Sequence, residues 1–109
     1  MVSFKRFDIV LVSLDPSLGS EIQKTRPCLI ISPDEMNKYI KTVIIAPMTS
    51  TQKDYPTRIL ITFDSVTGNI VLDQIRTIDK SRILKTIGKL ENTKVQQNVL
   101  DTLVDMFTF

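Results

Sequence analysis

Residues 8–13, Asp-Ile-Val-Leu-Val-Ser, form a short apolar run rich in β-branched side chains, and a turn-forming stretch, Asp-Pro-Ser-Leu-Gly-Ser, follows at 15–20. This combination predicts a β-strand that ends in a turn. Two similar apolar runs occupy 28–31 and 42–46, and Pro47 stops the second. Because these runs are continuous rather than strictly alternating, we expect strands that are buried on both faces or strongly curved.

Three further segments have the composition of strands. The segment Arg-Ile-Leu-Ile-Thr-Phe, which begins at residue 58, alternates so that Ile59, Ile61 and Phe63 share one face. Apolar runs within 69–75 and 83–90 predict two more strands.

Two segments carry helix start signals. Ser32 and Glu35 have the spacing of a capping box with a proline between them suited to the first helical position, so a short helix is predicted over about 33–39. Thr93 and Gln96 form a second such box. Behind it, apolar residues recur at helical spacing and predict an amphipathic C-terminal helix that packs on the sheet: Val95, Val99, Leu103, Met106 and Phe107.

The length and composition are those of one globular domain. A chain of 109 residues and 12.4 kDa, with 42% hydrophobic and 24% charged residues, can bury one core without disulfides or metals. We expect a single domain over 1–109. Many short strands with one terminal helix predict a mainly β (α+β) fold, built as a small, strongly bent sheet or barrel.

The residue types that the sequence lacks exclude several kinds of site. There is no histidine, which excludes Ser-His-Asp and Cys-His nucleophiles and most zinc and haem sites. The single cysteine, Cys28, cannot form an internal disulfide, and the three glycines are too scattered for a phosphate-binding loop. The N-terminus has no apolar stretch typical of a signal peptide, and no run approaches the ~20 residues that span a membrane. We therefore expect a cytoplasmic protein with no membrane contact.

Charge points only weakly to a partner. The net charge is +2, but residues 76–94 hold six basic side chains against two acidic ones. A solvated face and a footprint for phosphates or for an acidic partner both explain this local excess of +4.

Two polar loops separate predicted strands and are candidates for function. The loop at 14–27 is long for a connection between short strands and carries Glu21 and Arg26 five positions apart. The loop at 46–56 offers three consecutive hydroxyls, beginning with Thr49, directly after a strand end.

The order and spacing of short motifs along the whole chain resemble the MazF/PemK/Kid toxins of bacterial toxin–antitoxin systems. The motifs are Asp8-Ile9-Val10, Leu14-Asp15-Pro16, Gly19-Ser20-Glu21, Arg26-Pro27, Ile30-Ile31-Ser32-Pro33, Pro47-Met48-Thr49-Ser50, Tyr55-Pro56, Gly68 and Leu72-Asp73-Gln74-Ile75-Arg76-Thr77-Ile78-Asp79. The resemblance implies an SH3-like barrel that acts as a homodimer. It also implies a metal-independent endoribonuclease without cofactor, which cuts single-stranded RNA and thereby arrests growth.

The resemblance also implies roles for individual residues. The family's catalytic pair matches Arg26 and Thr49, and its first-loop glutamate matches Glu21, a supporting catalytic candidate. An aspartate proposed as an acid–base group in part of the family matches Asp73, for which a structural anchor is the alternative. Expected RNA contacts, with solvated charge as the alternative for the last two, are Ser20, Gln23, Lys24, Ser50, Gln74 and Arg76. Ile22 and Lys24 depart from the family's usual glutamine and glycine.

These side chains suit RNA cleavage, because RNA carries its own nucleophile, the 2′-hydroxyl. A guanidinium can contact two phosphoryl oxygens and remains charged at any relevant pH. Glu21 would be the general base if its pKa were raised. The resemblance further implies a short, acidic, partly disordered antitoxin that covers the RNA groove. The alternatives are a related barrel toxin that poisons a topoisomerase by binding alone, and an interaction module that has lost its activity.

Overall fold

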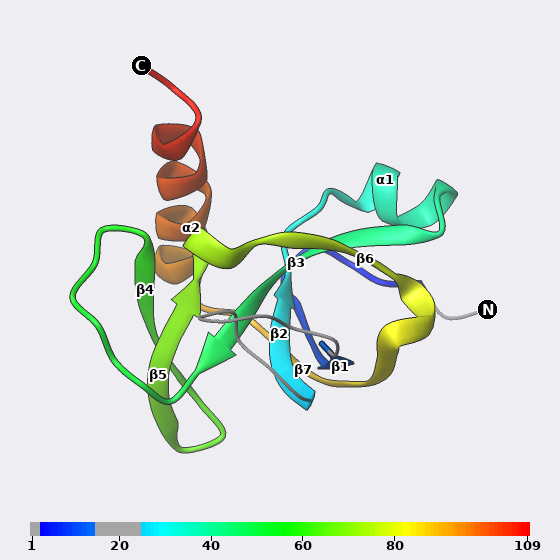
Figure 1. Cartoon of the computed structure of the whole chain (residues 1–109), viewed down its shortest axis with the longest axis horizontal. Coiled ribbons are helices and arrows are strands. Elements are labelled where there is room, and N and C mark those ends of the chain that lie inside the picture. Colours follow the sequence, from blue (N-terminus) through cyan, green and yellow to red (C-terminus); the bar gives the residue numbers. More distant parts are fainter. Residues whose placement is uncertain (1–2, 15–24) are drawn as a thin grey trace.

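The computed structural model describes residues 3–14 and 25–109, which form a curved antiparallel sheet with two helices (Figure 1). The α-helices are α1 (Asp34–Tyr39), between β2 and β3, and α2 (Thr93–Met106), near the C-terminus; two 3₁₀ turns, η1 (Leu72–Gln74) and η2 (Lys80–Arg82), flank β6. The strands of the sheet are β1 (Asp8–Ser13), β2 (Thr25–Ile30), β3 (Thr42–Thr49), β4 (Arg58–Phe63), β5 (Val66–Val71), β6 (Arg76–Asp79) and β7 (Ile83–Lys89). The expected mainly β fold with an inserted and a C-terminal helix is confirmed.

Strand β3 is the centre of the sheet, whose order is β4-β5-β3-β2-β1-β7. One edge of β3 pairs with β2, and the other edge pairs first with β6 and then with β5. The sheet curls so that its two end strands approach each other. Phe63 at the end of β4 lies over Gly88 of β7, where a Cβ atom would sit 2.6 Å from the ring. We call this contact between β4 and β7 the seam.

The apolar runs are buried on both faces, as their lack of alternation predicted. Ile9 of β1 packs in one core, whereas its neighbour Val10 packs in a second. Leu29 of β2 likewise faces the first core, and Ile30 faces the second. Helix α2 covers the first core through Val99, which is fully buried. The first three strands thus separate two cores, which explains why they contain so few polar residues.

The prediction of one strand over 69–75 is wrong. The segment contains the end of β5 and the 3₁₀ turn η1, and β6 begins only at Arg76. The turn is needed because β5 and β6 both pair with the same edge of β3, at Thr49 and at Ile45 respectively. Pro47 does not stop β3 either. It lies between these two pairings, where β3 changes partner and a missing N–H is tolerated.

Neither predicted capping box forms. Helix α1 begins at Asp34, because the Ser32 hydroxyl instead bonds Asn37 Oδ1 and accepts the N–H of Ile44 on β3. Helix α2 does begin at Thr93, but its cap is Asn92, whose Oδ1 accepts the N–H groups of Lys94 (3.0 Å) and Val95 (3.2 Å). Asparagine is as good a cap as threonine, and it comes first in the chain.

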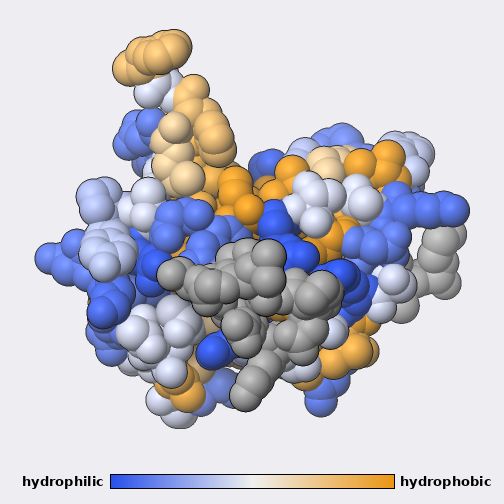
Figure 2. All heavy atoms as spheres, in the orientation of Figure 1, coloured by the Kyte–Doolittle hydropathy of each residue, from blue (hydrophilic) through white to orange (hydrophobic). Residues whose placement is uncertain are grey.

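Helix α2 buries most of its predicted stripe but not all of it. Val95, Leu103 and Met106 pack on the first core around Val99. Phe107 follows the last helical residue and is 74% exposed, so its assignment to the stripe is wrong. Figure 2 shows hydrophobic atoms along the side of this helix that faces the rest of the molecule and at the C-terminal end of the chain.

Candidate active site

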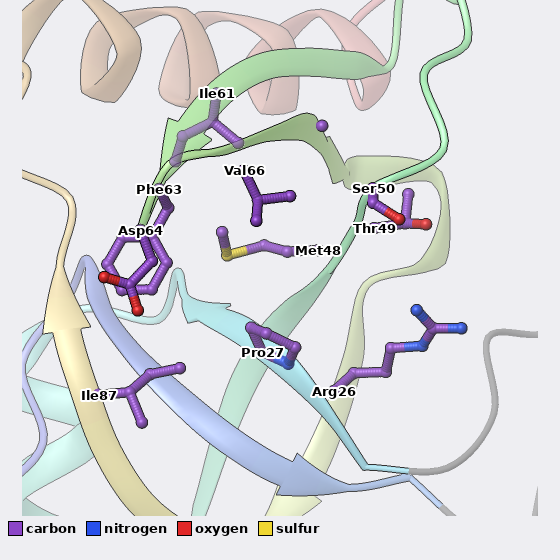
Figure 3. A pocket seen from close by; sticks show the side chains of 11 residues that line it. Arg26, Pro27, Met48, Thr49, Ser50, Ile61, Phe63, Asp64, Val66 and Ile87 are labelled. Atoms are coloured by element: carbon purple, nitrogen blue, oxygen red, sulfur yellow. The ribbon is translucent and has the colours of Figure 1, made fainter.

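A pocket of about 310 Å³ opens at the seam, and five strands contribute to it (Figure 3). Its polar side consists of Arg26 from β2, Thr49 from the end of β3, and Ser50. Its apolar side consists of Met48, Ile61, Phe63, Val66 and Ile87. Pro27, Asp64 and Gly68 complete the lining. The structure thus brings the predicted pair Arg26 and Thr49 to one pocket, although 23 residues separate them in the chain.

Arg26 is held by a paired strand rather than by a free loop. It lies opposite Val12 of β1, and its half-buried side chain reaches the polar side of the pocket. Burial raises the pKa of the neighbouring Cys28 thiol to about 12, while the positive charges of Arg76 and Arg26 oppose that rise. Both guanidinium groups therefore lie near this buried thiol, and Arg26 carries its positive charge at the polar side of the pocket.

Thr49 presents its hydroxyl at the end of β3. The hydroxyl oxygen accepts the backbone N–H of Thr51 at 3.2 Å, and a hydroxyl also has one proton to donate. This contact fixes the oxygen while leaving its proton for a ligand at the polar side of the pocket.

Strand β5 determines how the chain leaves Thr49. Gly68 passes so close that a Cβ atom there would overlap the Thr49 carbonyl oxygen. Asn69, which pairs with Thr49, is buried, and its Oδ1 accepts the N–H of Lys53 at 2.8 Å. The loop after Thr49 is therefore tied back to β5, and only glycine fits at position 68.

Asp73 lies in η1 and is not among the residues that line the pocket. Its carboxylate accepts two bonds from Arg58, at 2.7 and 3.1 Å, and a third from the Thr57 hydroxyl at 3.0 Å. The bond from Arg58 is the main reason that the pKa of Asp73 is lowered. These contacts join η1 to the start of β4 and match the structural anchor that was the alternative to an acid–base role.

The remaining predicted site residues fall into two groups. Ser50 is exposed and lines the pocket, whereas Gln74 and Arg76 are half-buried and do not line it. Arg76 donates to the Leu14 carbonyl at 3.4 Å. The other predicted residues lie outside the described residues: Ser20, Glu21, Gln23 and Lys24.

The basic segment 76–94 is distributed over β6, η2, β7 and the start of α2. Lys80 donates to the Asn37 carbonyl and so holds α1 against η2, which is a structural role. Lys85 and Lys89 are exposed on β7. A footprint for phosphates at these lysines stays a prediction.

Sequence analysis missed the far end of the pocket, formed by Phe63, Asp64, Val66 and Ile87. Asp64 and Ser65 form a two-residue turn in which both residues have positive φ, 54° and 65°. A signal was present in the sequence, because the polar pair follows the alternating segment 58–63 directly. The pair is not the Asn-Gly that marks such turns most clearly.

The described residues contain neither a metal-ligating cluster nor a membrane-spanning helix. Within 3–14 and 25–109, no group of three or more metal-ligating side chains that could hold an ion is found. No helix in that part of the chain is long and apolar enough to cross a membrane.

Comparison with known proteins gives a consistent family. The model of the family described as "PemK-like, MazF-like toxin of type II toxin-antitoxin system" matches residues 5–107. The chain is 36% identical to the protein named Endoribonuclease MazF of Staphylococcus saprophyticus, over 95% of this chain and 93% of that protein. A second protein of that name, from Staphylococcus epidermidis, is also 36% identical, over 96% and 94% of the two chains.

Solved structures share the fold. MazF from Deinococcus radiodurans matches with a TM-score of 0.84 at 24% identity, over 97% of each chain. The MazE–MazF crystal structure from the same organism matches with a TM-score of 0.78 at 25% identity, over 97% of this chain and 96% of that one. Together with the match over residues 5–107 and the pocket that joins Arg26 to Thr49, these likenesses show that the chain belongs to the PemK-like, MazF-like toxins of type II toxin–antitoxin systems.

Proposed function

We propose that this chain, acting as a single toxin domain over 1–109, is a metal-independent endoribonuclease that cleaves single-stranded RNA in the cytoplasm and inhibits growth. The observation that carries the proposal is the placement of Arg26 and Thr49 on one side of one pocket. The names of the staphylococcal relatives, both endoribonucleases, support it. They also disfavour the alternative of a toxin that poisons a topoisomerase by binding alone.

The polar side of the pocket suits a phosphodiester whose own 2′-hydroxyl attacks. The attack places two charges on the phosphoryl oxygens of the transition state, which a planar guanidinium can contact with two parallel N–H donors. Arg26 has that role. Thr49 donates its hydroxyl proton to a phosphoryl oxygen from a position fixed by the N–H of Thr51. Both donors are in place before the reaction. Donors that need no rearrangement when the charge develops stabilise a transition state most effectively.

The proton transfers need further groups. We propose Glu21 as the general base for the 2′-hydroxyl; it lies outside the described residues. Asp73 is a poor acid–base group in its present contacts, because Arg58 and Thr57 occupy its oxygens and its pKa is lowered. Ser20, Gln23, Lys24, Ser50, Gln74 and Arg76 stay proposed RNA contacts.

We propose two protein partners as well. A second copy of the chain would cover apolar side chains that are exposed near the C-terminus, Val104 and Phe107 among them. An acidic antitoxin would occupy the positive polar side of the pocket. That a similar chain from Deinococcus radiodurans is crystallised together with MazE supports a protein partner.

The test is cleavage of a mixed-sequence single-stranded RNA by the purified protein in excess EDTA, with sequencing of the 5′ ends. We expect cleavage at a short motif, with the same rate when Mg²⁺ replaces EDTA. Arg26→Ala should reduce the single-turnover rate by about 10²–10³. Arg26→Lys should restore only part of it, since a point charge lacks the two-donor geometry.

Lys38→Ala is the matched control, because Lys38 is exposed on α1 and does not line the pocket. It should cleave like the wild type, and all variants should melt like the wild type. Cleavage that is lost in EDTA and restored by Mg²⁺ would overturn the metal-independent mechanism. An Arg26→Ala variant that is folded and fully active would overturn the assignment of the site.

A further inference from the structure

The apolar side of the pocket has no evident use in phosphate chemistry. Figure 3 shows Arg26, Thr49 and Ser50 on one side of the pocket and Phe63, Asp64 and Ile87 on the other. A cavity of about 310 Å³ is small among binding pockets, which span roughly 300–1,000 Å³, so it suits one ring system. Its chemistry, an aromatic ring among aliphatic side chains with one carboxylate at the edge, suits a flat heterocycle with polar atoms on its rim.

We propose that the apolar side of the pocket binds one nucleobase of the RNA, and that Asp64 selects a base that carries an amino group. This inference rests on the proposed function and names how the same site chooses its substrate. The charges of the pocket orient the strand, because Arg26 attracts a phosphate whereas Asp64 repels one. A phosphate therefore binds at the polar side and an attached base lies toward Asp64.

Phe63 supplies a fixed surface for stacking. Its ring packs over Gly88 of β7, where no side chain larger than hydrogen fits, and it also lines the pocket. Stacking on an aromatic ring stabilises every base, because every base has a π-face. Phe63 therefore contributes affinity without choosing among bases, and the choice falls to a polar side chain.

Asp64 is the polar side chain on that side. Within the part of the chain that the structure describes, its carboxylate has no hydrogen bond or ion pair, and the residue is exposed at the pocket edge. An ionised carboxylate only accepts hydrogen bonds. Adenine, cytosine and guanine can each donate from an amino group, whereas the single donor of uracil, its N3–H, lies between two carbonyl oxygens that repel a carboxylate. Asp64 therefore favours an amino-bearing base over uracil.

The experiment measures binding and cleavage separately. Short single-stranded homopolymers of deoxyadenosine, deoxycytidine and deoxyuridine lack the 2′-hydroxyl and cannot be cleaved by its attack. We expect the wild type to bind the adenine and cytosine strands about tenfold more tightly than the uracil strand, the size expected of one hydrogen bond to a charged group. Asp64→Asn should bring the three affinities together, because an amide can also donate to uracil.

Ser65→Gly is the matched control, since it changes the same turn without changing a pocket residue. The Ser65→Gly variant should keep the wild-type order of affinities. The Asp64→Asn variant should fold, because asparagine tolerates the positive φ of this position. Equal affinities of the wild type for the three strands, or the same ratios in Asp64→Asn, would overturn the inference. The same proteins are then tested on the mixed-sequence RNA. If the affinities shift as expected but no protein cleaves RNA, the base pocket stands and the proposed function fails.

Discussion

The Thr49 hydroxyl can serve RNA cleavage because its oxygen and its proton have separate partners. The oxygen accepts the Thr51 N–H, and the proton is left for the phosphate. We expect Thr49→Ala and the isosteric Thr49→Val to impair single-turnover cleavage, and Thr49→Ser to retain part of it. Combining Thr49→Ala with Arg26→Ala should cost less than the two separate effects together, because both residues hold one phosphate.

Thr86→Ala is a control for these changes, since Thr86 is an exposed strand threonine that does not line the pocket. Full activity of a folded Thr49→Val variant would contradict the role given to the hydroxyl.

Asp73 offers a second test at this scale, on stability instead of cleavage. Its ion pair with Arg58 is partly exposed to solvent, so we expect Asp73→Asn to lower the free energy of unfolding by ~0.2–1 kcal/mol at neutral pH. The folded pKa of Asp73 is lowered. The stabilisation is therefore present above the ordinary aspartate pKa of about 3.9 and is lost as pH falls through the folded value.

Urea titrations at several pH values measure this difference, with the exposed Asp54→Asn as the comparison. A variant that melts like the wild type but no longer cleaves RNA would show that Asp73 takes part in the chemistry.

Among the elements, helix α2 is capped by a different residue from the one that the sequence predicted. Asn92 accepts two N–H groups of the first turn, whereas Thr93 is already helical. Asn92→Ala should therefore destabilise the protein by about 1 kcal/mol, the usual value for a lost cap. Thr93→Ala is the matched comparison and should change the melting temperature much less. The reverse order in thermal melts would restore Thr93 as the cap.

An element could be predicted from the sequence where its own local pattern of apolar and polar residues determines it. Strands could be predicted from the alternation at Ile59, Ile61 and Phe63 and from the apolar runs of β1, β2 and β3. Such patterns show directly which side chains of a strand are buried. The division of 69–75 into strand and 3₁₀ turn could not be predicted, because β3 imposes it from a distance. The family resemblance suggested Arg26 and Thr49. The apolar side of the pocket could not be predicted, because it forms only where β4 and β7 meet in the folded sheet.

At the scale of the whole molecule, the exposed apolar side chains of the C-terminal region favour association. Val104 is 62% and Phe107 74% exposed. We expect a homodimer whose mass, measured by light scattering at micromolar concentration, is about twice 12.4 kDa. Because the association is expected to be apolar, raising the salt concentration should not dissociate it. A monomer mass that persists at high protein concentration would contradict the prediction.

The buried thiol of Cys28 packs in the second core, on the same strand as Arg26. A thiol reagent can reach it only when β2 opens, so the rate of its modification reports the equilibrium between closed and open forms. A ligand that binds only the closed form slows the modification by the factor 1 + [L]/Kd. The rate of Cys28 modification therefore measures the affinity of a nucleic acid or an antitoxin for the protein. The measurement also works in variants that do not cleave RNA.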